Sequence, residues 1–486
     1  MTSAAIIGSG PNGLAAAVTL ARAGLDVTVF EAADTPGGGC RTEELTLPGF
    51  LHDWGSAVHP MAMTSPFFQA FGLTERVPYV VPEISYAHAL EPGTVGIAYR
   101  DLDRTAEGLS GDGSRWRRIF EPLVSRLEPV ANLISTPLGN APAHPILAAR
   151  LGLSVLAASP LGEASVGLRS EVARAMFAGV AAHGIGNIRS LALSAVGLIL
   201  AAHAHGPRGW PVPIGGAGAV TAALLADLEA HGGRVLTGTR ITHADELRGS
   251  DAIIFDTSAR DLAHIAGDVL PEKYCRNLRS FRYGNGSAKV DFALSEPVPW
   301  LDSALRDAPT VHLGESARSI ARAENAVTRG NMSDQPYVLI TQPSSVDPGR
   351  APEGKAVLWA YVHVPAGSDL DPTDIITARI EKFAPGFRDT ILASVHTSAA
   401  QVEARNPSMI GGDIGTGATD LPQLLARPVL AREPWRTPVP GLYLGSASVP
   451  PGPGVHGRGG FAAAGAALAD LGIPLPDLGF GSGRTV

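Results

Sequence analysis

The sequence predicts an α/β fold in which one discontinuous α/β domain with parallel strands has an α+β domain inserted into it in two pieces. Three observations lead to this prediction. A short apolar run, a glycine-rich turn and a helix-forming segment open the chain. Two further α/β stretches lie after residue 220 and near the C-terminus. The segments between them have longer apolar helices and alternating strands, which indicates a second domain.

The opening segment has the order strand, turn, helix, strand. Residues 4–7 are apolar and end at Gly8, as expected of a buried parallel strand. Residues 14–23 are rich in Ala and Leu and end at Gly24, which suits the C-terminus of a helix. Residues 27–30 are β-branched or aromatic and predict a second strand. Together they have the size of one βαβ unit.

The turn of this unit has the glycine spacing of a dinucleotide-binding loop. Gly8 permits the tight turn, Gly10 lets the backbone approach a pyrophosphate, and Gly13 allows the helix to pack closely on the strand. The first helical turn offers free N–H groups to phosphate oxygens. Glu31 ends the second strand, where a carboxylate accepts hydrogen bonds from ribose hydroxyls and disfavours a 2′-phosphate.

Later segments complete this domain. The elements expected there are a helix over 221–231, strands over 234–237, 252–255 and 441–445, and a helix over 461–471. We therefore expect a discontinuous nucleotide-binding domain that comprises residues 1–75, 207–280 and 430–486. Residues 76–206 and 281–429 then form the second domain, with helical lid segments.

Composition excludes several classes of protein. Apolar residues make up 45% of the 486 residues and the net charge is −8, so we expect a folded protein that does not bind nucleic acid. The two cysteines, Cys40 and Cys275, exclude a disulfide scaffold and a cysteine zinc site. His203 and His205 have no third ligand nearby, so we expect no metal. The first residues lack a basic leader, which indicates a cytoplasmic location.

Two further glycine-rich segments border the same predicted site. Pro36-Gly-Gly-Gly39 precedes Cys40 and Arg41, whose guanidinium supplies a fixed fork for phosphate. Gly454-Val-His-Gly457 leads into the last predicted helix, whose N-terminus favours negative charge. Such segments exceed what a simple nicotinamide-binding domain needs.

These motifs resemble those of the phytoene desaturase-like proteins in the amine oxidase and carotenoid desaturase superfamily. Glu31-x5-Gly-Gly-Gly-x-Arg41-Thr is similar to the second FAD fingerprint of that superfamily, and residues 440–457 are similar to its C-terminal flavin motif. Residues 284–300 and 406–428 resemble in particular the subgroup of pyridine nucleotide-disulphide oxidoreductase domain-containing protein 2-like proteins. Arg458 departs from the apolar residue usual after His-Gly in that subgroup.

The resemblance implies a Rossmann-like FAD-binding domain of the amine-oxidase/glutathione-reductase type with an inserted α+β substrate-binding domain. It implies FAD as cofactor and a desaturase, dehydrogenase or saturase that transfers hydride at flavin N5 to or from an apolar substrate, such as a polyene or isoprenoid. The residues expected to bind FAD are Gly8, Gly10, Pro11, Asn12, Gly13, Glu31, Gly38, Gly39, Arg41, Val235, Gly445, Gly454, Val455 and His456.

Two residues are candidates for catalysis. Lys289 lies in an apolar strand, where the resemblance implies an ammonium that holds a water near the flavin, although it could instead face solvent or pair with Asp291. His456 could line the substrate side or be held by the backbone. Because no second dinucleotide loop follows a strand, we expect reoxidation by oxygen, a quinone or a redox partner. The alternatives are an amine or amino-acid oxidase and an FAD-binding scaffold that acts through a protein partner.

Residues 190–207 carry no Asp, Glu, Lys or Arg. The segment contains glycine, proline and two histidines, which disfavours a membrane span. A buried core helix is the simpler interpretation, and peripheral contact with a membrane is the alternative. The sequence does not indicate an oligomeric state.

Overall fold

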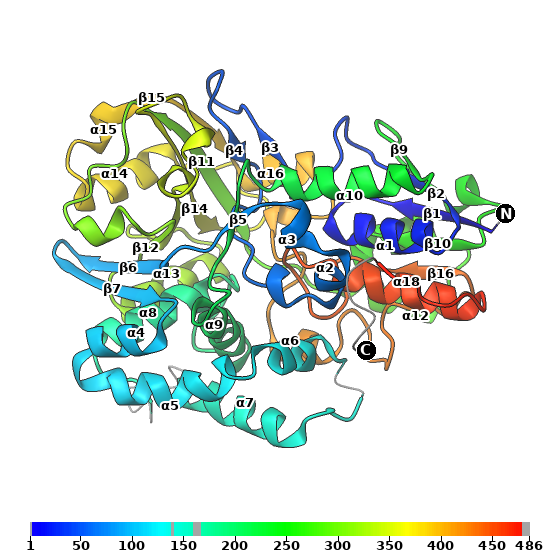
Figure 1. Cartoon of the computed structure of the whole chain (residues 1–486), viewed down its shortest axis with the longest axis horizontal. Coiled ribbons are helices and arrows are strands. Elements are labelled where there is room, and N and C mark those ends of the chain that lie inside the picture. Colours follow the sequence, from blue (N-terminus) through cyan, green and yellow to red (C-terminus); the bar gives the residue numbers. More distant parts are fainter. Residues whose placement is uncertain (1, 138–139, 159–166, 479–486) are drawn as a thin grey trace.

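Two β-sheets organise the chain, and each collects strands from distant parts of the sequence (Figure 1). The structure is a computed structural model that describes residues 2–137, 140–158 and 167–478. A five-stranded sheet forms one lobe and a seven-stranded sheet forms the other. Helices lie below and between the two sheets in this view.

The five-stranded sheet is parallel throughout and has the order β16-β10-β1-β2-β9. Its strands are β1 (Ser3–Ile7), β2 (Asp26–Phe30), β9 (Arg234–Leu236), β10 (Ala252–Phe255) and β16 (Leu442–Leu444). Because all strands run the same way, the ends of β1, β2 and β10 meet at one edge, where open α/β sheets bind ligands. The α/β class expected from the sequence is confirmed.

Helices cover both faces of this sheet, which explains why β1 is apolar on both sides. The helix α1 (Pro11–Arg22) packs between α10 (Gly218–Ala230) and α18 (Arg458–Asp470) on one face. The helices α11 (Ala259–Ile265) and α12 (Glu272–Arg279) bury Phe255 and their own leucines on the other. Alternate residues of β1 enter the two cores, Ala4 one and Ala5 the other.

The seven-stranded sheet is mixed and has the order β15-β11-β14-β13-β12-β6-β7, with β12 and β6 as its parallel pair. Its strands are β6 (Ile84–Glu91), β7 (Thr94–Tyr99), β11 (Gly286–Leu294), β12 (Thr310–Leu313), β13 (Val338–Thr341), β14 (Ala356–Val364) and β15 (Ile391–Thr397). Every residue of β11 and β14 is buried, because helices cover both faces. These helices are α8 (Glu171–Ala182), α13 (Ala317–Thr328), α14 (Thr373–Phe383) and α15 (Phe387–Thr390).

A helical layer closes the space between the lobes. It contains α4 (Leu102–Gly108), α5 (Gly113–Val124), α6 (Leu127–Ser135), α7 (Pro145–Ala158) and α9 (Leu191–Ala204). The uncharged segment 190–207 forms α9, which is largely buried against α7 and α8. It is therefore a core helix. Among the helices in the described part of the chain, none combines the length and the apolar character needed to cross a membrane.

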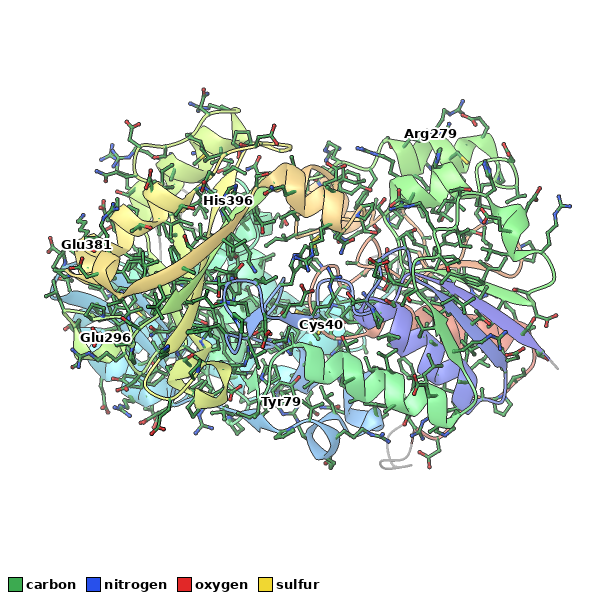
Figure 2. The ribbon with its side chains drawn as sticks, turned by 90° about the horizontal axis from the view of Figure 1, so that it is seen from above. Cys40, Tyr79, Arg279, Glu296, Glu381 and His396 are labelled. Carbon is green, nitrogen blue, oxygen red and sulfur yellow. The ribbon has the colours of Figure 1, made fainter. Side chains whose placement is uncertain are left out.

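Short elements connect the lobes and border the site. They are β3 (Thr42–Glu43), β4 (His52–Asp53), α2 (Pro66–Phe71), α3 (Leu73–Arg76), β5 (Tyr79–Val80), β8 (Val212–Pro213), α16 (Ala399–Arg405) and α17 (Leu421–Leu425). Figure 2 shows Cys40, just before β3, near the middle of the molecule, where the lobes meet. Where the domain boundaries fall along the chain stays a prediction.

Candidate functional site

The glycine turn after β1 is built so that no side chain could replace its glycines. Gly8 has a φ of 98°, and a Cβ there would lie 2.6 Å from the Asp256 carbonyl oxygen. A Cβ on Gly13 would lie 2.1 Å from the Gly8 carbonyl oxygen. Gly10 precedes α1, and Pro11 is the first helical residue, where its missing N–H costs nothing. The free N–H groups of this helix terminus therefore face the end of the sheet.

The second glycine run folds directly onto this turn. Gly37 donates its N–H to the Ser9 carbonyl at 3.1 Å, and a Cβ on Gly38 would lie 3.1 Å from the Gly10 Cα. Gly38 has a φ of 56°, which suits glycine. The two runs, in which Gly13 and Gly38 are 25 positions apart in the sequence, form one cradle of bare backbone.

Glu31 stands at the end of β2, beside this cradle. Its Oε2 accepts hydrogen bonds from the N–H and the hydroxyl of Ser9 at 2.9 and 2.5 Å, and its Oε1 accepts from the Ala33 N–H at 2.8 Å. The carboxylate is therefore held at the rim of the cavity. Its contact with a ribose stays a prediction.

A carboxyl that the sequence analysis did not single out lies inside the turn. Asp256 directly follows β10, and its Oδ2 accepts the Gly13 N–H at 2.8 Å. Burial raises the pKa of Asp256 to about 8, and the nearby charge of Glu31 raises it further, against the hydrogen bonds from Gly13 and Gly10. The sequence could have indicated Asp256, because an acidic residue directly after an apolar strand lies at the ligand-binding edge of a parallel sheet.

Arg41 supplies positive charge next to the second glycine run. Its guanidinium lies 5.0 Å from the Trp54 ring centre and donates to the Thr35 hydroxyl at 3.1 Å. Burial and the neighbouring Arg405 lower its pKa, which still leaves the group a cation. Its Nε lies 3.6 Å from Glu43 Oε1 in an ion pair, but it makes no hydrogen bond among the described residues, so this N–H could still donate to an anion.

One cavity of about 1660 Å³ joins this cradle to the space between the lobes. The predicted residues that line it are Gly8, Gly10, Pro11, Asn12, Glu31, Gly38, Gly39, Arg41, Gly454 and Val455. Its other end is apolar and lies among α6, α7, α9, α17 and β14. Residues that line this end include Leu133, Leu151, Val155, Val196, Ile199, Leu200, Tyr361, Ile414 and Leu424.

Four predicted cofactor residues do not line the cavity: Gly13, Gly445, Val235 and His456. Gly13 lies beneath the turn and holds Asp256. Gly445 lets β16 pack against α18, since a Cβ there would lie 3.2 Å from both Gly460 and Ala463. Val235 pairs with Val29 at the edge of the sheet. Contact of these residues with a cofactor stays a prediction. In the structure they shape the site through their packing and pairing.

Lys289 also lies outside the lining of the cavity. Its ammonium donates to the carbonyl oxygens of Asp53 and Trp54 at 2.9 and 2.7 Å and lies 3.2 Å from Asp291 Oδ2. Two carbonyl oxygens therefore accept its hydrogen bonds, and the Asp291 carboxylate forms an ion pair with it. The pairing with Asp291 corresponds to the structural alternative, and a catalytic role stays a prediction that this geometry does not favour.

His456 is buried behind the cavity wall. Its Nδ1 accepts the Arg458 N–H at 3.1 Å, so its Nε2 carries the proton and faces the Gly452 carbonyl at 3.2 Å. Burial, and the charge of Arg458, lower its pKa to about 3. The neutral ring thus caps the start of α18. Its catalytic role likewise stays a prediction.

A histidine that the sequence analysis did not name does line the cavity. His183 ends α8, and its Nε2 lies 3.0 Å from His312 Nε2. Burial lowers its pKa to about 3, so the ring is neutral. Tyr361 lines the cavity from β14. Neither residue lies in a local motif, and only the folding of distant segments brings them to the site.

Comparison with known proteins agrees with this arrangement. Residues 6–71 match the model of an NAD(P)-binding Rossmann-like domain. Pyridine nucleotide-disulfide oxidoreductase domain-containing protein 2 of Rattus norvegicus is 26% identical over 96% of this chain and 93% of its own. Phytoene dehydrogenase of Streptomyces griseus is 28% identical over 80% of this chain and 77% of its own.

The chain is thus similar over most of its length to oxidoreductases of the amine oxidase and phytoene desaturase superfamily. The solved structure of cyclohexylamine oxidase from Brevibacterium oxydans has the same fold, with a TM-score of 0.58 and 16% identity over 96% of this chain and 98% of that one. The resemblance inferred from the glycine-rich motifs is therefore confirmed at the level of the superfamily. At this identity the structural likeness shows the fold alone.

Proposed function

We propose that the protein binds FAD and adds or removes two hydrogens at an apolar carbon skeleton, such as a polyene or isoprenoid. The observation that carries this proposal is the single cavity with a bare glycine cradle at one end and an aliphatic wall at the other. The name of the Streptomyces griseus relative, a phytoene dehydrogenase, agrees with such a substrate.

The residues of the nucleotide end suit FAD. The cradle of Gly8, Gly10 and Gly38 would be filled by any Cβ, which is the mark of a backbone that a flat or anionic group approaches. Arg41 Nε and Asn12 Oδ1 are buried and have no hydrogen-bond partner among the described residues. Bound FAD would supply the site that accepts or gives a hydride.

The protein's own part is to bind, orient and keep out water. The helix N-terminus and Arg41 would hold the phosphates, and Glu31 the adenosine ribose. The aliphatic residues of α9 and α17 would hold the substrate in a dry space. When hydrogens are removed from the substrate, oxygen, a quinone or a redox partner would then reoxidise the cofactor, whereas their addition would require a redox partner that reduces it.

The amine oxidase alternative receives less support from the cavity. The acidic residues that line it come from 31–43 and 256–261, the segments that border the glycine turn. Elsewhere in the described lining no carboxylate is present to attract a substrate ammonium. A scaffold that acts only through a protein partner would not need a large internal cavity. The volume of about 1660 Å³ therefore favours a protein that acts on a small molecule.

The first test is the purified protein itself. We expect it to be yellow, to release FAD on denaturation, and to lose its flavin absorbance anaerobically with members of a polyene and isoprenoid panel. Gly10→Val should bind no FAD, since its Cβ would lie 2.7 Å from Asp256 Oδ2. The matched control is Gly108→Ala, where no atom lies within 4 Å of the new Cβ. Protein that takes up no added FAD would refute the proposal, and bleaching only by amines would favour the oxidase.

We also propose that apolar substrate enters from a membrane surface. The helix α7 borders the cavity and exposes Ile146, Leu153 and Leu156, with 71%, 67% and 54% of their surface accessible. Exposed leucines beside a cavity mouth suit contact with lipid. We expect cosedimentation with phosphatidylglycerol vesicles that Leu153→Glu weakens, while Leu475→Glu, another exposed leucine, does not. Equal binding of all three proteins would contradict this contact.

A further inference from the structure

The carboxyl of Asp256 occupies the place where the glycine turn offers its N–H groups. Its Oδ2 lies 2.8 Å from the Gly13 N–H, and a Cβ on Gly10 or Gly13 would meet the same oxygen at 2.7 or 2.9 Å. Asp256 also lines the cavity. A ligand phosphate at this turn would therefore lie next to a carboxyl group.

An ionised carboxylate is a poor neighbour for a phosphate, because two negative charges at contact distance repel each other. A protonated carboxyl group is a favourable neighbour, since its O–H donates a strong hydrogen bond to a phosphate oxygen. The protein favours the acid form. Burial raises the pKa of Asp256 to about 8, and the charge of Glu31 at the end of β2 acts in the same direction.

The other charged groups at this end of the cavity do not neutralise Asp256. Asp261 and His264 on α11, and Arg240 after β9, line the same end. The Asp261 carboxyl is bound to the Ser258 hydroxyl at 2.6 Å, and Arg41 is held by Trp54 and Thr35. No ion pair of Asp256 with a basic side chain is found among the described residues.

We propose that Asp256 is a proton-carrying ligand of the cofactor's diphosphate. In its acid form the carboxyl accepts the Gly13 N–H and donates its own proton to a phosphate oxygen; when it is ionised, the site rejects the dinucleotide. The inference rests on the proposed function, because it takes the diphosphate of FAD as the ligand. It assigns one further residue, Asp256, and one proton to the binding of that diphosphate.

The consequence is a dinucleotide affinity that depends on pH in one direction. Below about pH 8 the carboxyl is already protonated, so the dissociation constant of FAD stays constant. Above that pH each molecule of FAD must be bound together with one proton, so the dissociation constant rises about tenfold per pH unit. Asp256→Asn keeps an acceptor for Gly13 and a neutral donor, and its dissociation constant should not change over the same range.

The test is a titration of the full-length apoprotein with FAD, followed by flavin fluorescence, between about pH 6 and about pH 10. Asp261→Asn is the matched control: it removes a neighbouring carboxyl of the same cavity and should keep the alkaline loss of affinity. A constant affinity of the wild type at all pH values would overturn the inference. So would an alkaline loss that persists in Asp256→Asn.

A second measurement reads the proton itself. Infrared difference spectra of the wild-type apoprotein should show a protonated-carboxyl band that disappears near pH 8 and is missing from Asp256→Asn. Its absence from the wild type at neutral pH would overturn the inference even if the variant failed to fold. Titration with NAD⁺ separates the two proposals. Binding of NAD⁺ in place of FAD with the same pH dependence would refute the proposed function and leave the role of Asp256 standing. FAD binding without pH dependence would leave the proposed function standing and refute the role of Asp256.

Discussion

Buried charged side chains hold the segment that runs from β4 past the cavity. Lys289 binds the carbonyl oxygens of Asp53 and Trp54, and Arg350 donates to Asp53 Oδ2 at 2.9 Å and to Asp347 Oδ2 at 2.8 Å. Gly55 and Ser56, directly downstream, line the cavity. The charges therefore fix the shape of the site from behind.

The first prediction concerns the lysine. Lys289→Met should lower the free energy of unfolding by about 3–5 kcal/mol, because it leaves two carbonyl groups without their donor and the buried Asp291 without its neighbouring ammonium. Urea denaturation monitored by tryptophan fluorescence measures this loss, and the exposed Lys355→Met serves as control. A variant with wild-type stability and a normal flavin spectrum that lost only turnover would instead make Lys289 catalytic.

Sequence reasoning reached those site residues that belong to local motifs. Gly8, Gly10, Gly38 and Arg41 line the cavity because the turn and the second glycine run each fold within a few residues of the sheet edge. His183 and Tyr361 could not be found in this way. Each reaches the cavity only through the packing of α8 and β14 against distant segments, and nothing in its neighbours along the chain records that contact.

At the scale of elements, the close packing of α8 requires a glycine, which has no side chain. Gly179 faces two buried imidazoles, and a Cβ there would lie 2.6 Å from His88 Nδ1 and 2.9 Å from His312 Nδ1. The Tyr337 hydroxyl donates to the Gly179 carbonyl at 2.9 Å. The helix can thus approach β6 and β12 closely enough for His183 to meet His312 at the cavity wall.

Gly179→Ala should therefore destabilise the protein, although alanine is the better helix former. Helix propensity favours alanine by about 1 kcal/mol, whereas forcing an extra methyl group into a packed core costs about 1–3 kcal/mol. We expect a lower melting temperature in a calorimetric scan. Gly465→Ala in α18, where the new Cβ meets no atom within 4 Å, should raise the melting temperature slightly. An unchanged or higher melting temperature for Gly179→Ala would show that the two imidazoles can move aside.

Most elements of the five-stranded sheet were predictable from the sequence, but their bounds were not. The helix α18 begins at Arg458, before the expected start at Phe461, because Gly457 turns the chain with a φ of 63°. The helix α1 likewise begins at Pro11. Glycine and proline at these positions weaken the helical pattern that sequence reasoning relies on, although both are favourable at a helix start.

At the scale of the whole molecule, histidines buried in the neutral form tie stability to pH. Burial lowers the pKa of each of eight histidines from the usual 6.5. The pKa values are about 3 for His52, His183 and His456, about 4 for His59, His88, His203 and His205, and well below 6.5 for His312. Between these values and 6.5 the unfolded chain takes up protons that the folded chain refuses.

The protein should accordingly lose stability as the pH falls below about 6.5, and the loss should continue to about pH 4. Circular dichroism melts at a series of pH values measure it. His144→Gln, a change at an exposed histidine, should leave the profile as it is. A melting temperature that stays constant down to about pH 4 would show that these rings take up protons in the folded state.

The position of the edge strand β16 has a consequence for the synthesis of the protein. The strand Leu442–Leu444 joins the sheet next to β10, and Ser446, Gly454 and Val455 after it complete the wall of the cavity. A ribosome that has released only the first 430 residues has therefore made the glycine cradle but not the opposite side of the site. A ligand that contacts both walls of the cavity can therefore be held only after residues 446–455 have been made, and a chain that stops before them would have an open groove and a β10 strand without its partner β16.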